Sequence, residues 1–308
     1  MADPTAGVVE ALCPSYGGTW ILGDRLRLSL HANRVMGYHC TWEDGRGSWY
    51  LLSDLASSIP DTGLPQELRA LKPIYVAGEY GVGGHAVWDL GTAFLKIINP
   101  TSPHSTREHV TLQYVKQKKP SFIIPEVLYH GEWDGRYHLV VTRVPGPTLI
   151  KAWPEMTIEM KLDCIDRIVE ICQELASWRG DEIAGVDGGQ ICDRYLCNDD
   201  DEPNFSHECL LKSCQGLGMD CSTLVFFHCD LGPSNILYAN GGVSVIDWEV
   251  AGFVPKEWIR TKFRLSSGMD LDCEGELKYE YRTRVQARLG ESGFCDVADR
   301  WVARCAGK

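Results

Sequence analysis

Between residues 74 and 143, short runs of alternating apolar and polar residues are separated by glycine-rich or charged turns, a pattern typical of β-strands. The alternation predicts strands over 74–76, 85–89, 93–98, 125–129 and 137–143. A helix is expected over 105–118, because Ser105 and Glu108 have the Ser-x-x-Glu spacing of a capping box. This segment therefore predicts a small β-rich lobe with one helix.

The apolar period changes after residue 144. From about Pro154 to Trp178, the apolar residues are three or four positions apart, which predicts a long amphipathic helix with one buried face. A short strand ending at Phe227, a hairpin over 236–246 and a helical tail to Lys308 are expected to follow. This second part of the chain therefore predicts a mainly helical lobe.

Together these patterns predict an α+β fold with a β-rich N-lobe and a mainly helical C-lobe. We expect the N-lobe at residues 73–143 and the C-lobe, with its catalytic loop, at 144–308. Residues 1–72 are expected to be a lead-in that packs on the N-lobe. Within them, the alternation over 25–30 favours a strand.

Composition and charge narrow the classes of partner. The chain of 308 residues is 44% hydrophobic and 23% charged, which is ordinary for a globular protein. Its 30 Lys and Arg residues against 42 Asp and Glu residues give a net charge of −12, which would repel a nucleic-acid backbone. An acidic surface suits a cationic small molecule, although it also serves solubility alone.

Neither a membrane partner nor export is expected. No apolar run approaches the roughly 20 residues of a membrane span. The first residues have neither the basic start nor the apolar core of a signal peptide, so a cytoplasmic location is predicted.

The 13 cysteines form no Cys-x-x-Cys pair. Cys192 with Cys197, and Cys209 with Cys214 near His207, suggest zinc, but these spacings differ from those of common zinc ribbons. Reduced thiols of a cytosolic protein are the favoured interpretation.

The strongest chemical signal is the segment from His228 to Asn235, with Asp247 twelve residues further on. In phosphoryl transfer a protein mainly positions groups and neutralises charge. In such a site one carboxylate would orient the attacking hydroxyl and receive its proton, while an amide oxygen and another carboxylate would hold Mg²⁺. Asp230 alone could be a turn residue, but the three residues together favour a function.

These blocks resemble a known family. The His-x-Asp-x-x-x-x-Asn run over 228–235 and the later Asp247 are similar to the signature of aminoglycoside phosphotransferases and choline kinases, which are relatives of protein kinases. The sequence of these blocks is most similar to that of the large fungal set of phosphotransferase-family proteins, and the resemblance extends over about residues 74–260. The resemblance implies a bilobal protein-kinase-like fold, with ATP and Mg²⁺ as cofactors. It also implies that Asp230 is the catalytic base, that Asn235 and Asp247 are the metal ligands, and that the γ-phosphate is transferred to a hydroxyl of a small metabolite.

The resemblance also implies roles outside this loop. Lys96 matches the strand lysine that pairs with nucleotide phosphates, and Glu108 its helix partner, although the capping box alone would explain Glu108. Val141 and Arg143 lie in the expected inter-lobe linker, which meets adenine through backbone groups. His228 matches a structural hydrogen-bonding residue rather than a base.

A glycine-dense turn precedes the Lys96 strand. Gly81, Gly83 and Gly84 could let backbone N–H groups approach phosphates, but such turns also occur without a ligand. The spacing departs from the protein-kinase pattern, because Ala86 takes the third glycine position. The position of the turn just before the Lys96 strand favours nucleotide binding.

Departures from protein kinases favour a small acceptor. Cys229 and Gly232 replace the Arg and Lys of the kinase catalytic loop, and no Ala-Pro-Glu motif follows Asp247. There is then no room for a long peptide-docking segment, so a protein kinase is disfavoured.

The alternative from another class is a catalytically inactive kinase-like protein that binds a ligand or partner. The presence of Lys96, Asp230, Asn235 and Asp247 argues against it. The acceptor and the oligomeric state stay open.

Overall fold

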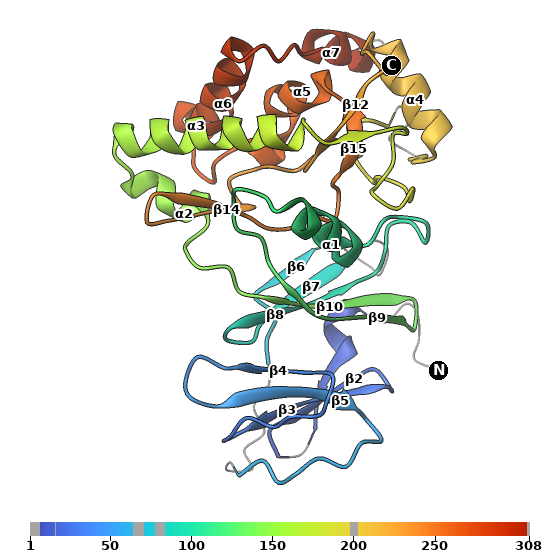
Figure 1. The fold of residues 1–308 in the computed structure, drawn as a ribbon, viewed down its shortest axis with the longest axis vertical. Coiled ribbons are helices and arrows are strands. Elements are labelled where there is room, and N and C mark those ends of the chain that lie inside the picture. The colour runs from blue at the N-terminus through green and yellow to red at the C-terminus, as the bar shows by residue number, and fades with distance from the viewer. Residues whose placement is uncertain (1–6, 16, 64–70, 78–83, 198–202, 307–308) are drawn as a thin grey trace. The chain divides into compact units, whose positions relative to one another are not determined.

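The computed structural model describes residues 7–15, 17–63, 71–77, 84–197 and 203–306 (Figure 1). The contacts divide the chain into two compact units: unit 1 contains Met1–Pro103 and Pro125–Arg143, and unit 2 contains His104–Ile124 and Val144–Lys308. Unit 1 is rich in strands and unit 2 is mainly helical. The expected α+β class, with β structure first and helices later, is confirmed.

The described residues of unit 1 form two antiparallel sheets of five strands each. The first, in the order β1-β2-β3-β5-β4, consists of β1 (Leu12–Pro14), β2 (Thr19–Leu22), β3 (Leu26–His31), β4 (Cys40–Glu43) and β5 (Trp49–Asp54). The second, in the order β6-β7-β8-β10-β9, consists of β6 (Tyr75–Ala77), β7 (His85–Asp89), β8 (Ala93–Ile98), β9 (Val127–Trp133) and β10 (Arg136–Thr142). A short 3-10 helix, η1 (Val8–Ala11), precedes β1.

The second sheet follows the alternation in the sequence. In β8, Ala93, Leu95 and Ile97 are buried and the residues between them are partly exposed, which is the period of a strand with one face on a core. The predictions for 85–89 and 93–98 match β7 and β8 residue for residue. The other three strands are present with bounds shifted by one to a few residues.

The first sheet differs from the expectation of one strand and a lead-in. Strands β3 and β5 bury several consecutive residues, and these include the polar Ser29, His31 and Ser53. The strand predicted from the alternation over 25–30 is present as β3. The sequence of β5 shows no such alternation, because both faces of this strand are covered.

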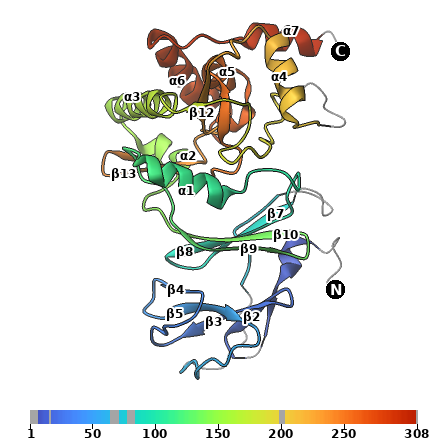
Figure 2. The same ribbon diagram turned by 45° about the vertical axis from the view of Figure 1, so that its right-hand side comes forward.

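The two sheets of unit 1 pack on one another, as both ribbon views show (Figures 1 and 2). Their shared core contains large side chains from both sheets, among them Trp20, Leu28, Trp42, Trp88 and Leu95. Burying such side chains contributes about 1.5–3 kcal/mol each to stability.

Polar contacts join the sheets at one edge. The indole N–H of Trp42 donates to the Leu90 carbonyl oxygen at 2.9 Å, and the Thr92 N–H donates to the Glu43 carbonyl oxygen at 2.9 Å. The β7–β8 turn is thereby fastened to the end of β4.

In the part of unit 2 that the structure describes lie the longer helices and two small sheets. The helices are α1 (Glu108–Lys118), α2 (Leu149–Ala152), α3 (Ile158–Leu175), α4 (His207–Gly216), α5 (Glu257–Leu265), α6 (Glu280–Glu291) and α7 (Ala298–Ala306), with the 3-10 turns η2 (Trp153–Glu155), η3 (Ser267–Met269) and η4 (Glu276–Tyr279). The antiparallel sheets are β11 (Arg179–Gly180), β12 (Leu224–Phe227) and β15 (Gly252–Pro255), and the hairpin β13 (Ile236–Ala239) with β14 (Gly242–Val245). The hairpin, the strand before it and the helical tail confirm the predictions.

Helix α3 is shorter than the predicted 154–178. Thr157 caps it, because its hydroxyl accepts from the Met160 N–H at 3.2 Å, and Pro154 lies in η2 before the cap. Ile158 and Leu162 are exposed, so the buried face of α3 begins only at Cys164.

Helix α1 begins at Glu108, so the predicted capping box at Ser105 is wrong. Ser105 forms a parallel bridge with Gln190, and the Thr106 N–H donates to the Gln190 carbonyl oxygen at 3.2 Å. Ser105 and Thr106 are therefore tied to Gln190 and do not form the first turn of the helix.

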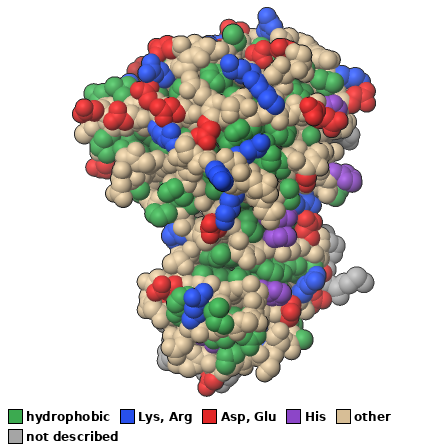
Figure 3. Space-filling model, in the orientation of Figure 1, with side chains coloured by type: hydrophobic (Ala, Val, Ile, Leu, Met, Phe, Trp, Pro, Cys, Tyr) green, Lys and Arg blue, Asp and Glu red, His purple; other side chains and the backbone are tan. Residues whose placement is uncertain are grey.

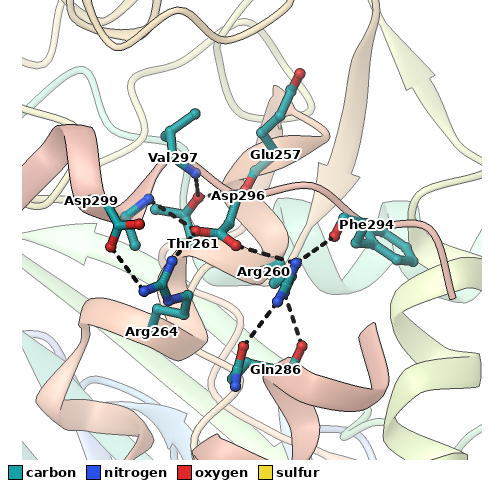
Figure 4. Close-up of polar contacts among 10 residues, drawn as sticks. Glu257, Arg260, Thr261, Arg264, Gln286, Phe294, Asp296, Val297 and Asp299 are labelled. Atoms are coloured by element: carbon teal, nitrogen blue, oxygen red, sulfur yellow. Dashed lines mark hydrogen bonds and ion pairs between the residues drawn. The ribbon is translucent and has the colours of Figure 1, made fainter. Parts of the chain in front are cut away.

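The tail is fastened to α5 by polar contacts (Figure 4). The Arg260 guanidinium donates to the carbonyl oxygens of Gln286, at 2.9 Å, and Phe294, at 3.2 Å. Arg264 contacts Asp296 at 2.6 Å and Asp299 at 2.9 Å. These contacts fix α5 against the segments around α6 and α7.

On the face shown in Figure 3, the acidic and basic side chains of unit 2 are interspersed. Among the described residues, no helix combines the length and apolar character that crossing a membrane requires.

Gly91 offers a test of the packing in unit 1. Its φ is +79°, and a Cβ built there would overlap the backbone of Asp44. Gly45 has a similar φ of +77° but open space around it, which makes it a matched control.

We expect Gly45→Ala to lower the free energy of unfolding by about 1–2 kcal/mol, the cost of a left-handed alanine. Gly91→Ala should lower it by more, because the backbone must also shift. Urea unfolding of both variants measures the difference, and equal midpoints would contradict the packing described.

Candidate active site

The segment between β12 and β13 forms a tight loop at the end of the three-stranded sheet. Phe226 and Phe227 are fully buried, so the strand before the loop is fixed in the core. Cys229 is also fully buried and has a φ of +63°, a left-handed conformation that costs a non-glycine residue about 1–2 kcal/mol. Burial also raises the pKa of its thiol well above the ordinary value. Cys229 is therefore an inert turn residue rather than a nucleophile.

His228 holds the loop to the following hairpin. Its Nδ1 accepts from the Asp230 N–H at 3.2 Å, and its Nε2 lies 3.0 Å from the Ile246 carbonyl oxygen. A neutral imidazole that accepts at Nδ1 carries its proton at Nε2, so Nε2 donates to Ile246. Both ring nitrogens are thus used in structural bonds.

Asn235 lies against Asp230. Its Nδ2 donates to the Asp230 carbonyl oxygen and to Asp230 Oδ2, both at 2.9 Å, and only 7% of Asn235 is exposed. Because the amide nitrogen is used in this way, the amide oxygen is directed elsewhere and can serve as a ligand atom.

The β13–β14 hairpin brings Asp247 to the same loop. Ile236 pairs with Val245, and the Ile246 N–H donates to the Asn235 carbonyl oxygen at 2.9 Å. Asp247 is the next residue and has a φ of +67°, a conformation that Asp tolerates better than most residues. The structure thus brings Asp230, Asn235 and Asp247 together within unit 2.

The charges around Asp230 act in opposite directions. Burial, the largest effect, raises the pKa of Asp230; the charge of Asp247 also raises it, while Lys262 lowers it. Asp230 is therefore a carboxylate whose basicity is increased by its surroundings.

Lys262 and Asp193 form a buried ion pair at 3.1 Å behind the loop. The Trp258 indole N–H donates to the second oxygen of Asp193 at 2.9 Å. Sequence reasoning missed this pair because neither residue belongs to a motif. The only signal was Lys262 on a helix face with the buried Trp258, Ile259 and Phe263.

Residues from the C-terminal part of unit 2 also pack closely against this loop. The Tyr281 hydroxyl donates to the Leu231 carbonyl oxygen at 2.9 Å. A Cβ on Gly232 would overlap the Gly268 carbonyl oxygen, and one on Gly268 would lie 3.1 Å from Asp230 Oδ1. Glycine at these two positions lets η3 approach the loop closely.

Glu108, predicted to pair with Lys96, contacts the loop region of unit 2. Only 1% of it is exposed, and its Oε1 accepts from the backbone N–H of Trp248 at 3.3 Å. The residue that follows Asp247 is thus held by a carboxylate from α1.

The remaining predicted residues lie in unit 1. Lys96 is half-buried on β8, between Val87 and Leu139 of the neighbouring strands. Val141 is buried on β10. The exposed Arg143 donates to the Gly91 carbonyl oxygen at 2.6 Å and forms an ion pair with Asp89, so its side chain supports the β7–β8 turn.

Of the glycine turn, Gly84 is described and its carbonyl oxygen accepts from the Asn99 N–H at 2.8 Å. Gly81 and Gly83 lie outside the described residues.

The donor atoms fit magnesium better than zinc. Asn235 and Asp247 offer an amide and a carboxylate oxygen, and Mg²⁺ usually takes only one or two protein carboxylates with water and phosphate oxygens. Among the residues that the structure describes, no group of three or more His, Cys, Asp or Glu side chains could hold a metal ion. The cysteines Cys192, Cys197, Cys209 and Cys214 are not in disulfide bonds.

No protein-family model matches the chain, and no curated protein sequence matches it. Solved structures do. The chain is similar to aminoglycoside phosphotransferases.

One of these structures is a thermostable mutant of aminoglycoside phosphotransferase APH(4)-Ia in a ternary complex with AMP-PNP and hygromycin B, with 17% identity, 75% of this chain and 82% of that chain covered, and a TM-score of 0.47. The APH(3'')-Id enzyme of Streptomyces rimosus has 13% identity, 75% and 91% coverage and a TM-score of 0.47. The streptomycin–ATP complex of APH(2")-IIa has 12% identity, 72% and 77% coverage and a TM-score of 0.44. Identities and TM-scores this low do not identify the reaction that the protein catalyses.

The raised pKa of Asp230 makes stability depend on pH. The folded protein holds this proton more tightly than the unfolded chain, so the ionised carboxylate costs stability above the raised pKa, and the cost disappears as the pH falls below the ordinary value. We expect Asp230→Asn, which cannot ionise, to unfold at a higher urea concentration than the unmodified protein at about pH 7.

The gain should shrink at about pH 4, where the Asp230 carboxyl of the folded protein takes up its proton. Asp163→Asn on the exposed face of α3 is the control and should show no such gain. An Asp230→Asn variant that is no more stable at either pH would show that burial of this carboxylate carries no cost.

Proposed function

We propose that the protein is an ATP- and Mg²⁺-dependent phosphotransferase that transfers the γ-phosphate to a hydroxyl of a small metabolite. The observation that carries this proposal is the contact between Asp230 and Asn235 at 2.9 Å, with Asp247 held beside Asn235 through Ile246. A carboxylate, an amide and a second carboxylate at one loop suit the positioning and charge neutralisation that phosphoryl transfer requires.

Asp230 is proposed as the catalytic base. It is partly exposed, and its raised pKa makes it a better proton acceptor than an ordinary aspartate. The bonds from Asn235 fix one oxygen and leave Oδ1 towards Gly268. His228 does not compete for this role, since both of its ring nitrogens are used within the loop.

Asn235 and Asp247 are proposed to hold Mg²⁺, which when bound neutralises phosphate charge. Lys96, with the turn at Gly81, Gly83 and Gly84, is proposed to contact the nucleotide phosphates. The backbone at Val141 and Arg143 is proposed to meet adenine. These assignments follow the sequence resemblance.

The acceptor is proposed to be small because β15 begins at Gly252, five residues after Asp247. A protein-kinase-like docking segment for peptides does not fit in so short a connection. The net charge of −12 suits a cationic acceptor. Hygromycin B and streptomycin, present in two of the similar structures, are useful first compounds for a screen.

The first test is ADP release from ATP across a panel of hydroxylated, cationic compounds, followed by Asp230→Ala on any substrate found. We expect this variant to lose turnover by about 10²–10⁴-fold, the usual contribution of a positioned base. Near-full activity of Asp230→Ala would refute the mechanism.

The second test separates catalysis from binding. Mg·ATP should raise the melting temperature of the unmodified protein and of Asp230→Ala, because Asp230 is not assigned to nucleotide binding. It should raise that of Asp247→Ala much less, with Asp163→Asn as the exposed control. Absence of a shift in the unmodified protein would contradict nucleotide binding, and a shift without turnover on any compound would favour the inactive ligand-binding alternative.

A further inference from the structure

Helix α1 contacts the rest of unit 2 through residues before it, within it and after it. Before its first turn, the Thr106 N–H donates to the Gln190 carbonyl oxygen at 3.2 Å and the Thr106 hydroxyl donates to Asp187. After its last turn, the Val245 N–H donates to the Ile123 carbonyl oxygen at 3.0 Å. Val245 is the last residue of β14, which leads directly to Asp247.

The middle of the helix packs on the sheet of unit 2. The Tyr114 ring lies 6.0 Å from Trp178, 5.3 Å from Phe226 and 6.0 Å from Phe253, centroid to centroid. Phe226 belongs to β12, the strand that ends at the catalytic loop. The helix and the loop thus share one aromatic core.

This attachment brings Glu108, the first residue of the helix, to the backbone of Trp248. The carboxylate is buried and accepts from the Trp248 N–H at 3.3 Å, although the two residues are 140 positions apart in the chain. A buried N–H without a partner costs about 1–3 kcal/mol, so the acceptor matters for this peptide.

The peptide between Asp247 and Trp248 needs such support because Asp247 has a φ of +67°. On the other side, the Trp248 indole donates to the Val245 carbonyl oxygen at 3.1 Å and its ring stacks on Phe122 at 6.0 Å. These contacts fix the tryptophan side chain, and Glu108 fixes the N–H at the point where the chain leaves Asp247.

We propose that Glu108 is a positioning residue for Asp247: by accepting from the Trp248 N–H, it holds the turn at Asp247, whose carboxylate would hold Mg²⁺. The inference rests on the proposed function and deepens it. The role needs an oxygen acceptor and no negative charge, whereas the expected ion pair with Lys96 needs the charge. A glutamine at position 108 separates the two roles.

The test compares Glu108→Gln and Glu108→Ala with the unmodified protein. Mn²⁺ affinity in the presence of AMP-PNP is measured by electron paramagnetic resonance, and exchange of the Trp248 amide hydrogen is followed by NMR without any ligand. Thr111→Ala, a matched truncation of a buried side chain on the same helix, is the control for packing.

We expect Glu108→Gln to keep Mn²⁺ affinity and a protected Trp248 amide, because its side-chain oxygen still accepts. Glu108→Ala should expose the amide to exchange and weaken Mn²⁺ binding by about 10–100-fold, as is usual when the partner of a metal-ligand group is removed. Thr111→Ala should retain both properties. If Glu108→Ala does not fold, the Mn²⁺ affinity of Glu108→Gln still decides between the acceptor role and charge pairing with Lys96.

Two results would overturn the inference: Mn²⁺ affinity of Glu108→Gln falling by 10-fold or more while its amide stays protected, or Glu108→Ala retaining both protection and affinity. The first would assign Glu108 to charge pairing. Failure of the proposed function looks different, since the unmodified protein and Asp247→Ala would then bind Mn²⁺ equally.

Discussion

The hydrogen bonds between the Asn235 amide and Asp230 are the contacts on which the rest of the site depends. They close the loop between β12 and β13, orient the amide, and fix one oxygen of the Asp230 carboxylate. Since the backbone of Asn235 also accepts from Ile246, the same residue sets the start of the hairpin and the position of Asp247. Asn235, through its side chain and its backbone, therefore links all three polar groups.

The backbone conformation of the loop that carries these groups is strained, and buried side chains around the loop stabilise it. Cys229 and Asp247 both have positive φ values, at a cost of about 1–2 kcal/mol each for residues other than glycine. Fully buried side chains on either side, such as Phe227, Leu231 and Trp248, offset this cost through burial. The strained backbone at Cys229 and Asp247 persists because the packed core around the loop holds it in place.

The sequence predicted the elements whose pattern is local. Strands β7 and β8, the β13–β14 hairpin and the loop between His228 and Asn235 have a clear alternation or motif. Of the first sheet it predicted only the strand over 25–30, which is β3, because β5 is covered on both faces and shows no alternation. It also placed the start of α1 at Ser105, because a capping box cannot reveal the competing bridge to Gln190. The Lys262–Asp193 pair could not be found, since its partners meet only in three dimensions.

The division of the chain has a consequence for dissecting the protein. The polypeptide passes between the units at residues 103–104, 124–125 and 143–144, so neither unit is one continuous stretch. A fragment that ends at residue 143 would remove α1 from unit 2 and leave its aromatic core, around Phe226 and Phe253, without Tyr114. Physical separation of the two halves therefore calls for a circularly permuted or grafted chain rather than a single cut.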